Sequence, residues 1–381
     1  MNQEIQIGGP PPLADVPLHS ILQHRTPNAL AHFVALEAPK LFARRIVMIE
    51  SLVGWLRVPE LTELSDVLRE WHSDLAQCPI RDDLHQLTQC ARRIVNSGRQ
   101  KATTLAIGIQ KLQSLVHNDI DFDEWLDEWL RARISTVILL EHFVALAPED
   151  VGGDGRKTGI VDLQCDVMEE IQEAMQEAAK LCKEHTNMRP PPVLLDGLQD
   201  CTLSCIPSKL QYLLLELLKN SMHATVKSKG AKSVHHPIQV TVCQDSEGII
   251  IRVSDEGEGI RGVTPTFAHV VVPGQMSDDL EDKSEIWSYL CRYPSRPSRS
   301  GGDRFGADRA TGPATELAGY GMGLPLARLR ARYLGGDLKL MTYPGYGTDA
   351  RLIMPKIQTV IKRGSEPMVQ QVQMKRQAVS E

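Results

Sequence analysis

Four polar side chains that could do chemistry interrupt a leucine-rich stretch, "ELLKNSMHA". They are Glu216, Lys219, Asn220 and His223, and their i, i+3, i+4, i+7 spacing places them on one face of a helix. A carboxylate can act as a general base, and a carboxamide oxygen is a suitable Mg²⁺ ligand. We expect this stripe to form the floor of a cavity. The simpler alternative is a solvated face with an ordinary ion pair between Glu216 and Lys219.

A second candidate site follows the apolar strand "GIIIRVSD", which ends in Asp255. Gly257 and Gly259 complete a D-x-G-x-G pattern. A carboxylate at a strand end can accept a hydrogen bond from an amino group, and glycines allow the backbone to approach a ligand closely. Alone, the pattern is equally consistent with a glycine-rich turn.

A third candidate site is "AGYGMGLP", in which Gly319, Gly321 and Gly323 lead into a predicted helix at Leu324. Free N–H groups and the positive end of the helix dipole make such a terminus suitable for an anion such as phosphate. Without a ligand, the same glycines would serve as a loop hinge. Downstream, "PGYGTD" places Thr348 at the start of the last predicted strand.

Hydrophobic periodicity divides the chain into two domains between flexible tails at 1–28 and 357–381. Residues 29–150 show helical spacing, which predicts a four-helix bundle. Residues 159–356 alternate strands and helices. They predict an α/β sandwich with one mixed sheet and helices on one face, so the fold class is α+β. The stretch 261–318, between the second and third glycine patterns, is long enough to be a functional lid.

Composition narrows the function classes. The 381 residues carry a formal net charge of −6, which gives no support to nucleic-acid binding. No apolar run reaches the length of about 18 residues that a membrane span needs. Eight cysteines in a chain of this length do not indicate a disulfide framework.

The three glycine and polar patterns, in this order, resemble the ATPase superfamily of gyrase, heat-shock chaperones, MutL and histidine kinases. Within it, "ELLKNSMHATV" and "GYGMGLPLARLRARYLGGDLKL" are similar to the mitochondrial α-ketoacid dehydrogenase kinases, which act on the pyruvate or branched-chain complexes. The bundle motifs "LVHNDI" and "WLRARIS" extend the resemblance, which covers about residues 29–356.

The resemblance implies a protein serine kinase that uses Mg-ATP and inactivates an α-ketoacid dehydrogenase complex. Glu216 would be the general base, Asn220 the Mg²⁺ ligand, and Asp255 the partner of the adenine amino group. The remaining implied site residues surround the nucleotide or assist the base: His117, Lys219, His223, Gly257, Gly259, Gly319, Gly321, Gly323, Leu324 and Thr348.

The resemblance also implies partners and a location. The dehydrogenase subunit would be the substrate, the lipoyl domain of the acyltransferase core would be the docking partner, and the kinase would be a homodimer in the mitochondrial matrix. Residues 1–24, which contain no arginine, are unlike a mitochondrial presequence. The stretches "ELLKN" and "YLGG" favour the branched-chain type over the pyruvate type.

Several residues depart from the family pattern. Glu256 and Glu258 add negative charge beside the expected nucleotide, and His223 stands where the family has arginine. Val137 replaces a family arginine associated with a small-acid inhibitor pocket in the bundle. Two alternatives therefore stay open: a histidine-kinase-like enzyme that phosphorylates itself at His117, and a non-catalytic nucleotide-binding member of the family.

Overall fold

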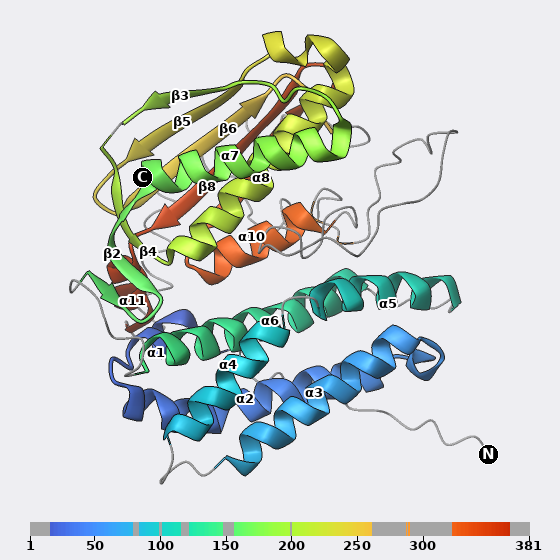
Figure 1. Cartoon of the computed structure of the whole chain (residues 1–381), viewed down its shortest axis with the longest axis vertical. Helices are drawn as coiled ribbons and strands as arrows, with labels where there is room; N and C mark the ends of the chain where they lie inside the picture. Colours follow the sequence, from blue (N-terminus) through green and yellow to red (C-terminus); the bar gives the residue numbers. More distant parts are fainter. Residues whose placement is uncertain are drawn as a thin grey trace, which may run out of the picture.

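A computed structural model describes residues 16–78, 84–98, 101–115, 122–147, 156–198, 200–260, 287, 289 and 322–365. The described chain forms a helical half and a sheet half, which lie one above the other in Figure 1. This arrangement confirms the predicted fold class. No described helix has the length and apolarity required to cross a membrane.

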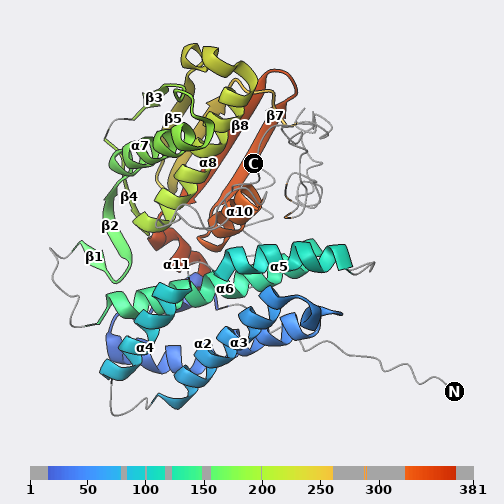
Figure 2. The same ribbon diagram turned by 45° about the vertical axis from the view of Figure 1, so that its right-hand side comes forward.

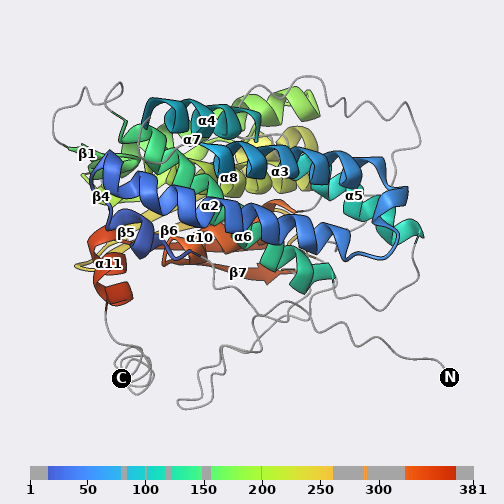
Figure 3. The same ribbon diagram turned by 90° about the horizontal axis from the view of Figure 1, so that it is seen from below.

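The first half is helical because apolar side chains recur at helical spacing and meet in one core. Its elements are α1 (Leu18–Leu22), α2 (Pro27–Glu50), the 3₁₀ turn η1 (Trp55–Arg57), α3 (Pro59–Gln77), α4 (Leu84–Ser97), α5 (Lys101–Leu115) and α6 (Phe122–Ala145). Figure 3 shows α2, α3 and α6 running side by side. α4 and α5 are separate helices, and α4 ends before Gly98, a residue with low helix propensity.

The second half is built on two sheets rather than one. β3 (Val193–Gly197), β5 (Ile238–Gln244), β6 (Gly248–Asp255), β8 (Gly347–Pro355) and β7 (Asp337–Tyr343) form a five-stranded sheet in that order. β3 pairs in parallel with β5, and the other pairs are antiparallel, so the sheet is mixed as predicted. β1 (Lys157–Thr158), β2 (Val161–Asp166) and β4 (Thr202–Cys205) form a separate small sheet.

Three helices cover one face of the large sheet: α7 (Val167–Thr186), α8 (Pro207–Lys229) and α10 (Gly323–Tyr333). They lie in front of the strands in Figure 1, and Figure 2 shows the layer from the side. A short 3₁₀ segment, η3 (Gly230–His235), follows α8 and leads into β5. α8 begins at Pro207 and has no side-chain cap.

The tails expected at 1–28 and 357–381 differ from the structure where it describes them. Residues 16–28 include α1 and the start of α2, and Leu18, Ile21 and Leu22 are buried. At the other end, α11 (Ile357–Ser365) continues the ordered chain and packs against α1. Both short helices depend on tertiary contacts, because helices of this length are marginal in water.

Candidate functional site

The polar stripe of α8 runs from the protein core to the surface. Leucines fill the buried faces of the helix, and the stripe begins at Glu216, which is only 4% exposed. Lys219 and Asn220 are half-buried, and His223 is exposed. Partial loss of hydration and the nearby charges of Lys227, His185 and Lys219 lower the pKa of His223. The stripe is therefore not a uniformly solvated face.

Glu216 is held from two sides. The ammonium of Lys219 donates to Oε1 of Glu216 at 2.6 Å, and both side chains are largely enclosed. On the other side lies Gly323, the first residue of α10, where a Cβ atom would be 2.6 Å from Oε2 of Glu216. A side chain at this position would therefore displace the carboxylate of Glu216. The positive end of the α10 dipole also favours a carboxylate here.

Asn220 lies one turn beyond Glu216 on α8. Its half-buried side chain makes no hydrogen bond with any residue that the structure describes. The carboxamide oxygen is therefore available to a ligand, which fits the requirement of Mg²⁺ for oxygen donors. No described cluster of three His, Cys, Asp or Glu side chains offers a different metal site.

Asp255 lies at the end of β6 beside the middle of α8. Its Oδ1 accepts the N–H of Gly257 at 2.9 Å, and Ser221, next to Asn220 on α8, also hydrogen-bonds to the carboxyl group. Burial raises the pKa of Asp255, while these two donors oppose the rise. Thr348 is the residue opposite Asp255 in the pairing of β6 with β8.

The D-x-G-x-G turn is tightly packed. A Cβ atom at Gly257 would lie 3.0 Å from that of Ala224 on α8. Gly259 has a φ of 65°, and a Cβ there would lie 2.6 Å from the carbonyl oxygen of Tyr343. Close packing and left-handed backbone explain why glycine occupies both positions.

The β7–β8 hairpin fixes the far side of the turn. The N–H of Gly345 donates to the carbonyl oxygen of Glu258 at 2.8 Å. The N–H of Ile260 donates to Oγ1 of Thr342 at 2.7 Å, and that hydroxyl lies 3.3 Å from Oγ1 of Thr348. Thr348 is therefore part of one hydrogen-bonded border with the turn.

Glu256, one of the two additional glutamates, lies against a histidine side chain. Oε2 of Glu256 lies 2.5 Å from Nδ1 of His236, on the loop that precedes β5. A protonated His236 would offset the negative charge that the sequence places beside the turn. The sequence offered no signal for this pair, which joins residues 20 positions apart.

Some predicted site residues lie outside the described part of the chain. They are His117, Gly319 and Gly321, together with all of the expected lid except Trp287 and Tyr289. Leu324 is described and follows Gly323 in the first turn of α10. The structure thus brings together Glu216, Lys219, Asn220, Asp255, Gly257, Gly259, Gly323, Leu324 and Thr348 around α8 and its neighbours.

The helical bundle contains a small cavity beside Val137. Arg45 of α2 and Arg133 of α6 line it and are 3% and 5% exposed. Burial, together with the charge of Arg133, lowers the pKa of Arg45 to about 9. The cavity therefore keeps a cationic lining although Val137 replaces the expected arginine.

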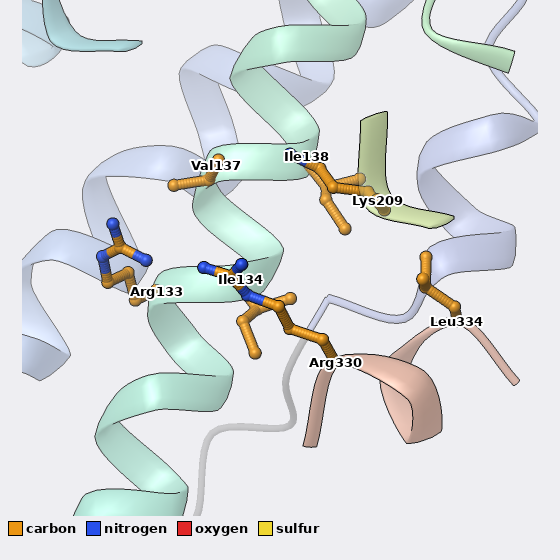
Figure 4. A pocket seen from close by; sticks show the side chains of 7 residues that line it. All are labelled: Arg133, Ile134, Val137, Ile138, Lys209, Arg330 and Leu334. Atoms are coloured by element: carbon orange, nitrogen blue, oxygen red, sulfur yellow. The ribbon is translucent and has the colours of Figure 1, made fainter. Parts of the chain in front are cut away.

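A second small cavity lies where the two halves meet. Figure 4 shows α6 on one side and side chains of α8 and α10 on the other. The lining residues are Arg133, Ile134, Val137, Ile138, Lys209, Arg330 and Leu334. Lys209 also pairs with Glu141 of α6 at 2.6 Å, which ties the start of α8 to the bundle.

Comparison with known proteins gives two family matches. A model described as "Mitochondrial branched-chain alpha-ketoacid dehydrogenase kinase" matches residues 18–162. A second, described as "Histidine kinase-, DNA gyrase B-, and HSP90-like ATPase", matches residues 205–358. The first corresponds to the helical half, and the second begins at the end of β4 and includes the whole site around α8.

Curated relatives resemble most of the chain at low identity. A mitochondrial [pyruvate dehydrogenase (acetyl-transferring)] kinase of Drosophila melanogaster is 30% identical over 71% of this chain and 62% of its own length. Isozyme 1 from Rattus norvegicus is 28% identical over 72% of this chain and 59% of its own length. The Arabidopsis thaliana kinase is 29% identical over 86% of this chain and 84% of its own length. The chain thus spans about three-fifths of the first two relatives.

Proposed function

Because the chain belongs to the mitochondrial α-ketoacid dehydrogenase kinase family, within the histidine kinase, gyrase B and HSP90-like ATPases, we propose that it is an ATP-dependent protein kinase. Its substrate would be a serine of the dehydrogenase subunit of an α-ketoacid dehydrogenase complex, which phosphorylation inactivates. The observation that carries the proposal is the position of α8. One helix brings Glu216 against the start of α10 and Ser221, beside Asn220, against Asp255.

Asp255 sets the orientation of the nucleotide. Its carboxylate accepts the adenine amino group, and Gly257 and Gly259 leave room for the base beside the turn. Thr348 borders the same space through its contact with Thr342. Phosphates bind at the N-terminus of α10, where Gly323 and Leu324 contribute free N–H groups together with Gly319 and Gly321.

Glu216 acts as the general base. Its carboxylate takes the proton of the serine hydroxyl as that oxygen attacks the terminal phosphorus of ATP, the bond from that phosphorus to the bridging oxygen breaks, and ADP leaves. Lys219 donates a hydrogen bond to the carboxylate at 2.6 Å and offsets phosphate charge. Mg²⁺, held by the amide oxygen of Asn220, would neutralise charge on the phosphates. His223 lies on the same helix face nearer the surface, and His117 would contact the base.

The partners follow from family membership and from one structural feature. The helices lie on one face of the large sheet, and Ile250 of β6 is 42% exposed. We assign the open face of that sheet to contact with a second copy, which gives a homodimer. The lipoyl domain of the acyltransferase core is the docking partner in the mitochondrial matrix, consistent with the word mitochondrial in the relatives' names.

The bundle cavity is the place for small-molecule regulation. Arg45 and Arg133 supply positive charge to a dry, largely apolar space, which suits a small carboxylic acid. Arg45, on α2, would supply the positive charge that the family's arginine would provide at position 137. The acid would be related to the ketoacid substrate of the target complex.

The experiment that tests the function offers radiolabelled ATP to purified pyruvate and branched-chain complexes side by side. We expect label on the dehydrogenase subunit of one complex, with the branched-chain complex favoured, and loss of activity of that complex. Asn220→Ala should abolish Mg²⁺-dependent ATP binding in calorimetry, whereas unchanged affinity would remove Asn220 from the metal site.

The same experiment separates the alternatives. Acid-labile label on the chain itself would identify a histidine-kinase-like enzyme. Tight ATP binding without label on either complex would identify a non-catalytic member, a case that the buried, ion-paired state of Glu216 makes worth testing. No ATP binding at all would overturn the proposal.

A further inference from the structure

Two side chains between the second and third glycine patterns connect the halves of the molecule, and the proposed mechanism does not use them. Tyr289 is 4% exposed. Its backbone N–H donates to Oδ1 of Asp123 at 2.8 Å, and its hydroxyl donates to Oδ1 of Asp127 at 3.0 Å. Both carboxylates belong to the first two turns of α6, so a segment 160 residues further along the chain is fixed to the bundle.

Trp287 contacts α10, the helix whose N-terminus is proposed to bind the phosphates. The guanidinium carbon of Arg328 on α10 lies 4.2 Å from the centre of a Trp287 ring, which is a cation–π geometry. Arg328 is 5% exposed, and with Arg332 it hydrogen-bonds to Asp337 at the start of β7. Tyr289 thus contacts α6, and Trp287, two positions earlier in the chain, contacts the middle of α10.

The start of α10 is the part of this helix that matters to the site. Arg328 is fewer than two helical turns from Gly323, whose backbone lies against Glu216. A helix moves as a rigid element over so short a distance. A shift at Arg328 therefore displaces the N–H groups that face the phosphates.

We propose that Tyr289 is a positioning residue that, with Trp287, sets the first turn of α10 against Glu216 and so determines the affinity for the triphosphate. This inference rests on the proposed function and deepens it. A hydroxyl donating to a carboxylate inside the protein is a strong hydrogen bond. Burial keeps the pKa of Tyr289 above its ordinary value, so the donor form persists at neutral pH.

Calorimetry with Mg-ATP and with adenosine tests the assignment on the intact chain. Tyr289→Phe should weaken ATP binding about tenfold, the size of one hydrogen bond to a charged group, because the phosphate contacts move. Adenosine affinity should stay within about twofold, because the base is held by Asp255 and its turn at the end of β6 and not by the start of α10. Asp127 keeps its 2.7 Å contact with Arg131, so the substitution leaves no isolated charge.

Two further variants complete the test. Asp127→Asn weakens the same contact from the α6 side and should lower ATP affinity in the same direction by a smaller factor. Tyr333→Phe is the matched control, since it removes a 2.7 Å hydrogen bond to the carbonyl oxygen of Val16 at the opposite end of α10. Its ATP and adenosine affinities should equal those of the parent.

The outcomes separate this inference from the proposed function. A parent chain that binds neither ATP nor adenosine overturns the function. A parent that binds both, with parental ATP affinity in Tyr289→Phe, overturns only the positioning role. Equal losses for ATP and adenosine would also overturn it, because they indicate general destabilisation. Should Tyr289→Phe fail to fold, Asp127→Asn decides by the same ATP-to-adenosine comparison.

Discussion

α8 and the helical bundle both bury charge, but they do so in opposite ways. On α8, Glu216 is 4% exposed and has an ammonium partner 2.6 Å away. In the bundle, Arg45 is 3% exposed and has no salt bridge with any residue that the structure describes. Its guanidinium donates long hydrogen bonds to the carbonyl oxygen of Leu41 and the hydroxyl of Thr136, and its other neighbours are Arg133 and the rings of Phe42 and Trp129.

The difference indicates what each region is built to do. A buried charge with a fixed partner is held in one position, which suits the proposed role of Glu216 as a general base. A buried cation that lacks a carboxylate carries an unrelieved desolvation cost, which an anionic ligand can offset. α8 is therefore organised before any ligand binds, whereas the bundle cavity is completed by one.

The largest expected effect concerns Glu216 on α8. Glu216→Gln keeps the shape of the side chain but cannot accept the serine proton. Phosphoryl transfer should slow by ~10² to 10⁴, while ATP affinity stays nearly unchanged. Steady-state kinetics with the labelled complex and calorimetry measure the two quantities, with Glu184→Gln on the exposed end of α7 as control. A variant as active as the parent would rule out Glu216 as the base.

Replacing Lys219, the partner of Glu216, tests how much the ion pair contributes to the free energy of unfolding. Lys219→Met leaves the Glu216 carboxylate buried without compensation and should lower the free energy of unfolding by about 4 kcal/mol. The double variant Lys219→Met/Glu216→Gln should recover much of that loss, since no unpaired charge remains. Urea denaturation of all three chains measures it. If Lys219→Met unfolds with the same free energy as the parent, the ion pair between Glu216 and Lys219 contributes no more than a solvent-exposed pair.

The sequence predicted α8 better than the bundle interior for a physical reason. Glu216, Lys219 and Asn220 interrupt a leucine run at helical spacing, so periodicity alone revealed a polar face. It could not show that Glu216 is enclosed, because enclosure comes from Gly323, more than a hundred residues later. The D-x-G-x-G pattern was recognisable because its glycines are required by close packing.

Buried polar residues of the bundle gave no comparable signal. Arg45 and Arg133 lie at positions that helical spacing assigns to the core or its edge, and spacing does not reveal which polar groups lose water. Tyr289 was hidden in a segment with no periodicity, and its role depends on contacts with α6. Tertiary contacts of this kind cannot be derived from local pattern.

His142 of α6 is a third buried polar side chain, and its burial changes how the stability of the chain depends on pH. It is 1% exposed; its Nδ1 accepts the N–H of Ile160 at 3.4 Å, and its Nε2 has no hydrogen-bond partner among the described residues. Burial lowers the pKa of His142 from 6.5 to about 4. The folded state therefore holds the neutral ring, and its contribution to stability is complete above pH 6.5.

As the pH falls from 6.5 towards 4, His142 binds a proton in the unfolded chain but not in the folded chain. Stability should drop by up to about 3 kcal/mol over this window. His142→Gln should remove that part of the pH dependence, while His32→Gln, on an exposed position of α2, should keep it. Urea denaturation at several pH values measures the slope, and an identical slope in His142→Gln would contradict the assignment.

The smallest expected effect has the opposite sign to that of Lys219→Met. Arg45→Met removes a desolvated charge and its repulsion from Arg133, at the loss of two contacts with aromatic rings and two long hydrogen bonds of 3.4 and 3.5 Å. We expect the free energy of unfolding to rise by about 1 kcal/mol, because an apolar side chain of similar volume suits the cavity better. Thermal unfolding measures the gain, and stabilisation of the parent by a short aliphatic carboxylic acid should disappear in the variant. A destabilised Arg45→Met chain would show that Arg45 has a compensating partner, and the contrast with α8 would then fail.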